Sequence, residues 1–248
     1  MAIQKVGVVG CGLMGSGIAE VCARSGFNVV VSEVNQKFLD KGMAAITSSL
    51  TRAAEKGKIS AQDKDAALSR IKGVVGLESF IDRDLVIEAV IENMDEKKRI
   101  FSTLDRVCPA HAILASNTSC LSVTEMAMST KRPDKVLGMH FFNPVPVMRP
   151  VEIVKTILTS EETLNTAREV SKKLGKEAIL AKDTPGFVVN RLLIPYMLDA
   201  IRVLEAGVAT REDIDNGMVL GSNHPKGPLT LSDIIGLDTQ LLIADAKY

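Results

Sequence analysis

The sequence predicts an α/β protein whose sheet-based part is followed by a smaller, all-helical part. Short apolar runs alternate with helical periodicity up to about residue 182, which is typical of a parallel sheet with crossover helices. The first apolar run, residues 6–9, leads directly into a glycine-rich turn and a helix. After residue 183 every periodic stretch is helical. We therefore expect two domains, residues 1–182 and residues 183–248.

The composition of the 248-residue chain excludes several classes of protein. Lysine plus arginine and aspartate plus glutamate number 30 each, so the charge balance predicts neither a nucleic-acid nor a membrane partner. No apolar run reaches the ~18 residues of a membrane span. The first strand begins too soon after Met1 to leave room for a signal peptide, so we expect a cytoplasmic protein. The four cysteines form no CxxC pair, and we expect no metal site and no disulfide framework.

The glycine-rich turn has the spacing Gly10-x-Gly12-x-x-Gly15. Gly10 permits a tight turn after the strand, and Gly12 has no Cβ, so a pyrophosphate can approach the backbone. Gly15 allows the helix to pack close to the strand. The helix that opens with Leu13 and Met14 presents free N–H groups and the positive end of its dipole to the phosphates.

A second apolar strand, residues 28–33, strengthens this interpretation. It ends in Glu33, which lies 23 residues after Gly10, near the ~20 expected for the acid that binds the adenosine ribose. A carboxylate there repels a 2′-phosphate, which favours NAD over NADP. The pattern is that of a Rossmann-type dinucleotide-binding sheet. The alternative is a purely structural turn with Glu33 on the surface.

The next segment is too long for a simple crossover. Helical patterns cover residues 35–58 and 61–71 before a strand at 73–77, about three times the dozen residues that a crossover needs. We expect an inserted helical hairpin. Its Ser49, Arg52 and Lys56 are placed to contact a phosphorylated ligand. The alternative is an ordinary solvated helix face.

The remaining elements follow the same two periodicities. Strands are expected at 84–90, 112–115, 136–139, 151–154 and 177–180, and helices at 95–107, 122–128, 161–174, 187–206, 210–220, 228–235 and 237–246. Pro195 should kink the helix 187–206 or break it locally.

Several polar residues follow the expected strands, where ligands of such sheets bind. Glu92 and Lys97 come after the strand 84–90, and Ser119 ends a polar turn, residues 116–119, after the next strand. We therefore expect these residues near the cofactor. The alternatives are a helix-cap acid, an exposed lysine and an ordinary loop.

His140 follows the strand 136–139 and precedes a proline-rich corner. An imidazole titrates near neutral pH, so His140 is a candidate for proton transfer. Glu152, on the returning strand, is placed to reach the other ring nitrogen and form a His–acid dyad. The alternative is a polar residue at a strand end with no catalytic role.

Five blocks together resemble the L-3-hydroxyacyl-CoA dehydrogenase family, most closely the bacterial 3-hydroxybutyryl-CoA dehydrogenases. The blocks are the glycine motif 10–15, the turn Ser-Asn-Thr-Ser at 116–119, His-Phe-Phe-Asn-Pro-Val-Pro at 140–146, Val-Glu-Ile-Val at 151–154, and Asp-Thr-Pro-Gly-Phe-Val-Val-Asn-Arg at 183–191. They occur in order along the whole chain, and the blocks at 140 and 183 are more specific than the glycine motif.

The resemblance implies a role for each matching residue. His140 would be the catalytic base and Glu152 its paired carboxylate. Ser119 and Asn190 would contact the substrate around the reacting carbonyl, with Ser119 also near the nicotinamide. Asn143 would hold the active site and the cofactor together. The other implied contacts are Gly10, Gly12, Leu13, Met14, Gly15, Glu33, Glu92 and Lys97 with NAD, and Ser49 and Lys56 with the CoA moiety.

The resemblance also implies a function. The expected reaction moves a hydride between C3 of a short-chain (S)-3-hydroxyacyl-CoA and NAD, in fatty acid or butanoate metabolism, and the expected assembly is a homodimer. Family members continue for a few tens of residues past the position of Tyr248, so we expect a truncated helical domain and a weakened dimer. Two alternatives stay open: a non-catalytic, crystallin-like NAD-binding relative, and a β-hydroxyacid or imine dehydrogenase with a similar cofactor domain.

Overall fold

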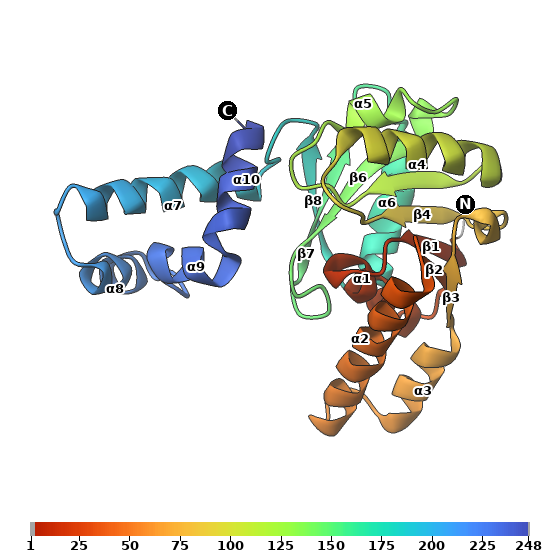
Figure 1. Ribbon diagram of the computed structural model, residues 1–248, viewed down its shortest axis with the longest axis horizontal. Coiled ribbons are helices and arrows are strands. Elements are labelled where there is room, and N and C mark those ends of the chain that lie inside the picture. The colour runs from red at the N-terminus through yellow and green to blue at the C-terminus, as the bar shows by residue number, and fades with distance from the viewer. Residues whose placement is uncertain (1–2, 248) are drawn as a thin grey trace. The chain divides into compact units, whose positions relative to one another are not determined.

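The computed structural model describes residues 3–247 of the chain, apart from the side chains at 242, 246 and 247 (Figure 1). The chain divides into two compact units, Met1–Asp183 and Thr184–Tyr248, and we describe each by itself. Residues 1, 2 and 248, at the ends of the two expected domains, lie outside the described residues.

The first unit is built on one eight-stranded sheet with the order β3-β2-β1-β4-β5-β6-β7-β8. All neighbouring strands are parallel except β6 and β7, which are antiparallel. The strands are β1 (Lys5–Val9), β2 (Asn28–Glu33), β3 (Ile71–Val75), β4 (Leu85–Glu88), β5 (Ile113–Ser116), β6 (Val136–Phe141), β7 (Pro150–Lys155) and β8 (Glu177–Lys182). The predicted Rossmann-type sheet is confirmed.

Helices cover both faces of this sheet. Apolar side chains of α1, α2, α3 and α6 form one buried cluster with the strands, and α4 and α5 lie over the opposite face (Figure 1). The helices are α1 (Leu13–Arg24), α2 (Gln36–Glu55), α3 (Ala61–Ser69), α4 (Met94–Val107), α5 (Val123–Ala127) and α6 (Glu161–Lys173), with single turns η1 (Glu78–Phe80) and η2 (Pro133–Lys135). Helices α2 and α3 project as the predicted hairpin.

Two boundaries differ from the prediction in ways that affect the site. Strand β6 runs to Phe141, past the expected end at 139, because His140 and Phe141 continue the pairing with β7. His140 therefore lies within a strand and not in the corner after it. Strand β3 begins at Ile71, where a helix end was expected, because Ile71 pairs with Val29 of β2. The other element ends differ from the prediction by at most three residues.

The second unit contains four helices among its described residues: α7 (Val189–Glu205), α8 (Arg211–Ser222), α9 (Pro228–Ile235) and α10 (Leu237–Lys247). Of the two outcomes expected at Pro195, a kink or a local break, the break is wrong, because α7 runs through Pro195 as one helix. Ile194 and Met197 on either side are buried, and α7 packs against α9, so tertiary packing compensates for the hydrogen bond that proline cannot donate. The carboxylate of Asp215 in α8 accepts the first N–H groups of α9, from Leu229 at 2.8 Å and Thr230 at 2.9 Å.

No helix in the described part of either unit is both long enough and apolar enough to cross a membrane.

Candidate active site

The glycine-rich turn between β1 and α1 has a bare backbone. Gly10 has a φ of +92°, and a Cβ on Gly15 would lie 1.9 Å from the carbonyl oxygen of Gly10. These two glycines are therefore required by the turn itself. At Gly12, the N-cap of α1, no described atom lies within 4 Å of an added Cβ, and no described side chain caps the helix. Uncapped N–H groups beside open space at a helix N-terminus fit the pyrophosphate of a dinucleotide.

Glu33 lies at the end of β2, beside this turn. Its Oε1 accepts a hydrogen bond from the backbone N–H of Cys11 at 2.7 Å, and its Oε2 accepts one from Val34 at 3.1 Å. The carboxylate is thus held at the rim of the glycine turn, where the sequence places it. Burial first, and then the charge of Glu33, raise the pKa of the Cys11 thiol to about 12, so this thiol stays neutral.

A buried ion network links the next strand to α4. The Nζ of Lys97 lies 2.6 Å from Oε1 of Glu88 and 3.3 Å from Oε2 of Glu92. Glu88 is fully buried and also accepts hydrogen bonds from the Ser116 hydroxyl at 2.6 Å and the Val90 N–H at 2.7 Å. The carboxylates of Glu88 and Glu92 thus compensate the charge of a lysine that is 1% exposed, and the donors from Ser116 and Val90 satisfy the Glu88 carboxylate.

This network excludes the alternatives that the sequence left open for Glu92 and Lys97. Lys97 is buried and not on the surface. The N-cap of α4 is Asn93, whose side chain accepts from the N–H of Glu96, and not Glu92. Sequence reasoning missed Glu88, although a carboxylate at the end of an otherwise apolar strand is the available signal.

Glu92 in turn holds the polar turn after β5. Its carboxylate accepts from the backbone N–H of Ser119 at 2.7 Å, from the Ser119 hydroxyl at 3.0 Å and from the Thr118 hydroxyl at 3.0 Å. The Ser116 hydroxyl accepts from the N–H of Thr118 at 3.1 Å. Ser119 is therefore positioned through Glu92 by the buried Lys97, and the structure brings these three predicted residues together.

His140 and Glu152 form the predicted pair. They are directly opposite in the antiparallel ladder between β6 and β7, and the distance from His140 Nδ1 to Glu152 Oε2 is 2.7 Å. His140 is 6% exposed and Glu152 is fully buried. The ring of Phe142 lies 4.6 Å from the imidazole, centroid to centroid. A buried carboxylate on one ring nitrogen selects the tautomer and stabilises the protonated ring.

The strand that carries His140 is also tied to the turn that carries Ser119. The side-chain oxygen of Asn117 accepts the backbone N–H of Phe141 at 2.9 Å, and the N–H of Asn117 donates to the Glu88 carbonyl at 2.7 Å. Asn143, two residues past β6, is exposed. The carboxyl ends of β4, β5 and β6 are thus joined at one edge of the sheet.

The remaining predicted residues lie on helices. Ser49 and Lys56 are seven residues apart on α2 and its C-cap, with the exposed Arg52 between them, so all three share one helix face. Asn190 is the second residue of α7 and belongs to the second unit.

The last residue of the first unit has a structural role that the sequence did not reveal. The carboxylate of Asp183 accepts from the N–H groups of Val123 and Thr124, at 3.1 and 2.7 Å, and from the Ser122 hydroxyl at 3.1 Å. It therefore caps the N-terminus of α5 from 59 to 61 positions away in the chain, a distance at which no local pattern signals a partner.

Two family models match the chain. The NAD binding domain of 3-hydroxyacyl-CoA dehydrogenase matches residues 5–184, and the 3-hydroxyacyl-CoA dehydrogenase C-terminal domain matches residues 186–248. The chain is 50% identical to a 3-hydroxybutyryl-CoA dehydrogenase of Mycobacterium tuberculosis, over 100% of this chain and 87% of that protein. It is 44% identical to the mitochondrial hydroxyacyl-coenzyme A dehydrogenase of Sus scrofa, over 99% and 80%.

The fold is also similar to that of a solved structure. The crystal structure of (S)-3-hydroxybutyryl-CoA dehydrogenase from Ralstonia eutropha has a TM-score of 0.95 and 47% identity, covering 99% of this chain and 87% of that one. The chain belongs to the 3-hydroxyacyl-CoA dehydrogenase family.

Proposed function

We propose that this chain transfers a hydride between C3 of a short-chain (S)-3-hydroxyacyl-CoA and NAD, and so interconverts that thioester with the 3-ketoacyl-CoA in fatty acid or butanoate metabolism. The observation that carries the proposal is the buried pair of His140 and Glu152, with 2.7 Å between Nδ1 and Oε2. It lies at the carboxyl end of β6, in the unit that holds the glycine turn. Ligands of open α/β sheets bind at that edge.

In the oxidative direction His140 acts as a general base through Nε2 and takes the proton from the 3-hydroxyl oxygen. Glu152 holds Nδ1 and stabilises the imidazolium that results. In the reductive direction the same imidazolium returns the proton to the carbonyl oxygen. The redox chemistry belongs to the nicotinamide when NAD is bound.

Ser119 and Asn190 orient the reacting carbonyl in this proposal, and Asn143 holds the cofactor side of the site. Glu92 and Lys97 act on the nicotinamide side. Lys97 is buried, so its part is to fix Glu92, which in turn fixes Ser119.

The parts of NAD and of the acyl-CoA that do not react bind away from His140 in this proposal. The start of α1, from Gly12 to Gly15 and including Leu13 and Met14, binds the pyrophosphate, and Glu33 binds the adenosine ribose and rejects a 2′-phosphate. Ser49 and Lys56 on the hairpin contact the CoA moiety. Residues 1–182 would then serve as the NAD-binding domain and residues 183–248 as the substrate and dimerisation domain. The homodimer and the cytoplasmic location stay predictions.

The decisive experiment follows NADH oxidation by the purified 248-residue protein with acetoacetyl-CoA, beside acetoacetate and beside NADPH. We expect turnover only with the CoA ester and NADH. Equal rates with free acetoacetate would contradict the substrate assignment and favour a β-hydroxyacid dehydrogenase. Tight NADH binding without turnover would indicate a non-catalytic NAD-binding protein. No NADH binding would overturn the cofactor assignment.

A further inference from the structure

The first unit contains a cavity that the proposed reaction does not use. Its volume is about 810 Å³, and it is lined by the C-terminal ends of α1 and α6, one side of α3 and the loop at residues 146–149. The residues proposed for CoA, Ser49 and Lys56, do not line it. Val21 and Arg24 of α1 line it, and the 12 residues of that helix separate Arg24 from the glycine turn by about 18 Å.

The lining of this cavity carries a large excess of positive charge. Its charged residues are Arg24, Arg70, Arg149, Lys173, Lys176 and Asp63. Arg24 pairs with Glu20 at 3.4 Å, and Arg149 pairs with Glu177 at 2.9 Å. Within the described part of the chain, no carboxylate forms an ion pair with the other three cations. Like charges gathered in one concave surface favour an anionic ligand.

Most carbonyl groups in the last turns of α1 and α6 do not accept hydrogen bonds from these cations. The N–H groups of Gly26 and Phe27 bond to the last turn of α1, and those of Gly175 and Lys176 bond to the last turn of α6. Gly26 and Gly175 have φ values of +87° and +69°, and no described atom lies within 4 Å of a Cβ added to either. Both helices therefore end in bare backbone turns that leave the floor of the cavity open.

Three of the cations are held in place by contacts with neutral groups. Arg70 donates through Nη1 to the carbonyls of Ala23 and Ala66, at 3.4 and 3.2 Å. Lys173 lies 4.1 Å from the centroid of the Phe27 ring. Pre-positioned cations lose little side-chain freedom when an anion binds.

Lys176 is held most firmly. Its Nζ donates to the carbonyls of Val145 and Met148, at 2.5 and 2.6 Å, which leaves one of its three N–H groups for a ligand. Burial, and then the charge of Arg24, lower the pKa of Lys176. Two cations close enough to disfavour each other's charge are stabilised by an anion between them.

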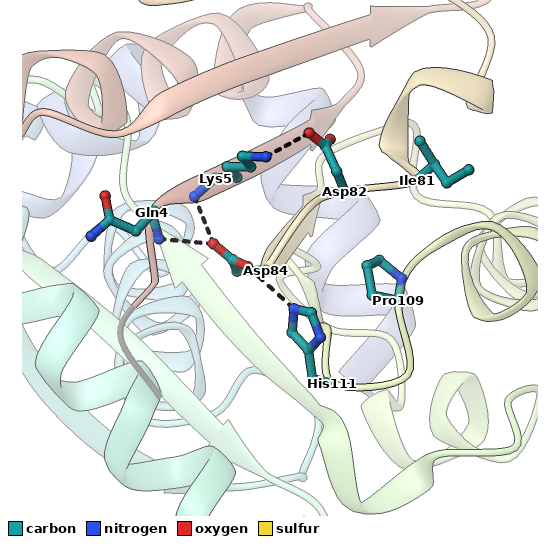
Figure 2. A pocket seen from close by; sticks show the side chains of 7 residues that line it. All are labelled: Gln4, Lys5, Ile81, Asp82, Asp84, Pro109 and His111. Carbon is teal, nitrogen blue, oxygen red and sulfur yellow. Dashed lines mark hydrogen bonds and ion pairs between the residues drawn. The ribbon is translucent and has the colours of Figure 1, made fainter.

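Another cavity of the same unit, at the start of β1, provides a contrast. It is lined by Asp82 and Asp84 with Lys5 and His111, and Figure 2 shows each acid bonded to a neighbour in the cavity wall. The charges of that cavity are satisfied internally, whereas those at the ends of α1 and α6 are in excess.

We propose that the basic cavity at the ends of α1 and α6 binds the di- or triphosphate group of a small metabolite. A single phosphate would contact only part of a cavity of about 810 Å³. The lining contains three arginines, a side chain that can bind phosphate oxygens bidentately, and Val21, Ile59 and Leu174 provide an apolar wall for the rest of the ligand. This site goes beyond the proposed dehydrogenase reaction and does not depend on it.

The test is calorimetric titration of the full chain with pyrophosphate, ADP and adenosine, in the presence of saturating NAD⁺ and free CoA. Under these conditions the cofactor and substrate sites are filled. We expect one additional site for pyrophosphate or ADP, an affinity that falls as salt rises, and no binding of adenosine. If pyrophosphate and ADP bind with equal affinity, the site recognises the phosphates alone. If ADP binds more tightly, the site also recognises the nucleoside. Both results support the proposal.

Two single variants locate the site. Arg24→Gln and Lys173→Gln should each weaken binding about tenfold, the size of a charge-assisted contact. Arg99→Gln, a matched exchange at a side chain that is 79% exposed on α4, should change nothing. If Arg24→Gln fails to fold, Lys173→Gln carries the test. Absence of binding to the unaltered chain, binding of adenosine with the same affinity, or equal weakening by Arg99→Gln would overturn the proposal.

Discussion

His140 and Glu152 are opposite each other in the ladder of β6 and β7, so backbone pairing, and not a mobile loop, sets the distance between imidazole and carboxylate. Both side chains are almost completely removed from water. In such surroundings a hydrogen bond to a carboxylate is stronger than it would be on the surface, and an unpaired partner is costly. The two residues therefore act as one unit, and their separate removal has different consequences.

At the residue scale, we expect His140→Ala to lower kcat by about 10²–10⁴-fold, the usual contribution of a positioned proton-transfer group. The dissociation constant for NADH should change little, because His140 itself is not among the residues proposed to contact the dinucleotide. Stopped-flow reduction of acetoacetyl-CoA and a fluorescence titration with NADH measure the two quantities. Near-normal turnover in this variant would remove His140 from the mechanism.

Glu152→Gln separates charge from orientation at the same site. The amide keeps a hydrogen-bonding oxygen for Nδ1 but cannot stabilise the imidazolium, so we expect a smaller loss of kcat than in His140→Ala. Stopped-flow reduction of acetoacetyl-CoA measures this loss. An unchanged kcat would show that the charge of Glu152 is not needed and that Glu152 only orients the ring.

At the scale of elements, the ion network of Glu88, Lys97 and Glu92 joins β4, α4 and the turn after β5. The local sequence of each of these three elements favours its own conformation, but it does not fix how the three lie relative to one another. The buried charges do so, because each must remain paired to stay away from water. Ser119 receives its position from this junction.

We expect Glu88→Gln to lower the free energy of unfolding of the first unit by about 3 kcal/mol, the lower end of the range for breaking a buried pair, since Glu92 remains beside Lys97. Urea denaturation followed by circular dichroism measures this change. Glu177→Gln, which removes an exposed partner of Arg149, is the matched control and should cost less than about 1 kcal/mol. Similar losses in both variants would mean that the network adds no stability of its own.

At the scale of the whole molecule, the edge of the sheet opposite the site is fastened by Asp84 (Figure 2). Its carboxylate accepts the N–H groups of Gln4 and Lys5, at 2.9 and 2.8 Å, and contacts His111 Nε2 at 3.2 Å. Burial raises the pKa of Asp84, but these bonds outweigh it and hold the pKa below its ordinary value of 3.8. The start of β1 is thereby tied to β4.

This depressed pKa predicts a pH dependence of stability. The contribution of Asp84 is fully present above the pKa of the unfolded chain, and it is lost as the pH falls through that value to the pKa of the folded state. Asp84→Asn should therefore be less stable than the unaltered chain at pH 7, and the difference should shrink from about pH 5 downward. Thermal unfolding between pH 3 and pH 7 tests this, with Asp65→Asn, at an exposed surface pair with Lys64, as control. A constant difference across this range would contradict the assignment.

The division of the chain into two units leads to a second prediction at this scale. The residues proposed to bind NAD all lie in the first unit, whereas Asn190 lies in the second. A fragment of residues 1–183 should therefore bind NADH with an affinity close to that of the full chain and show no turnover of acetoacetyl-CoA. Fluorescence titration and the NADH oxidation assay measure both. Turnover by the fragment at the full rate would show that the second unit is dispensable for catalysis.

Much of this protein is determined by local sequence. The glycine turn, the strand ending in Glu33, the helical hairpin and the helices after residue 186 are readable because glycine sterics and the periods of 2 and 3.6 residues act between near neighbours. The contact between His140 and Glu152 could also be anticipated, because a short, proline-rich corner forces the chain to return beside itself. These features depend on chemistry within about a dozen residues.

Only the tertiary structure decided the rest. The sequence predicts Lys97 near the cofactor and leaves an exposed position open as the alternative, and only the structure shows that Lys97 is buried where Glu88 and Glu92 meet it at the end of β4. Asp183 caps a helix about 60 positions earlier in the chain, and the basic cavity combines the ends of α1, α3 and α6. Burial and charge pairing between distant segments depend on how the layers pack, and no local period in the sequence encodes that packing.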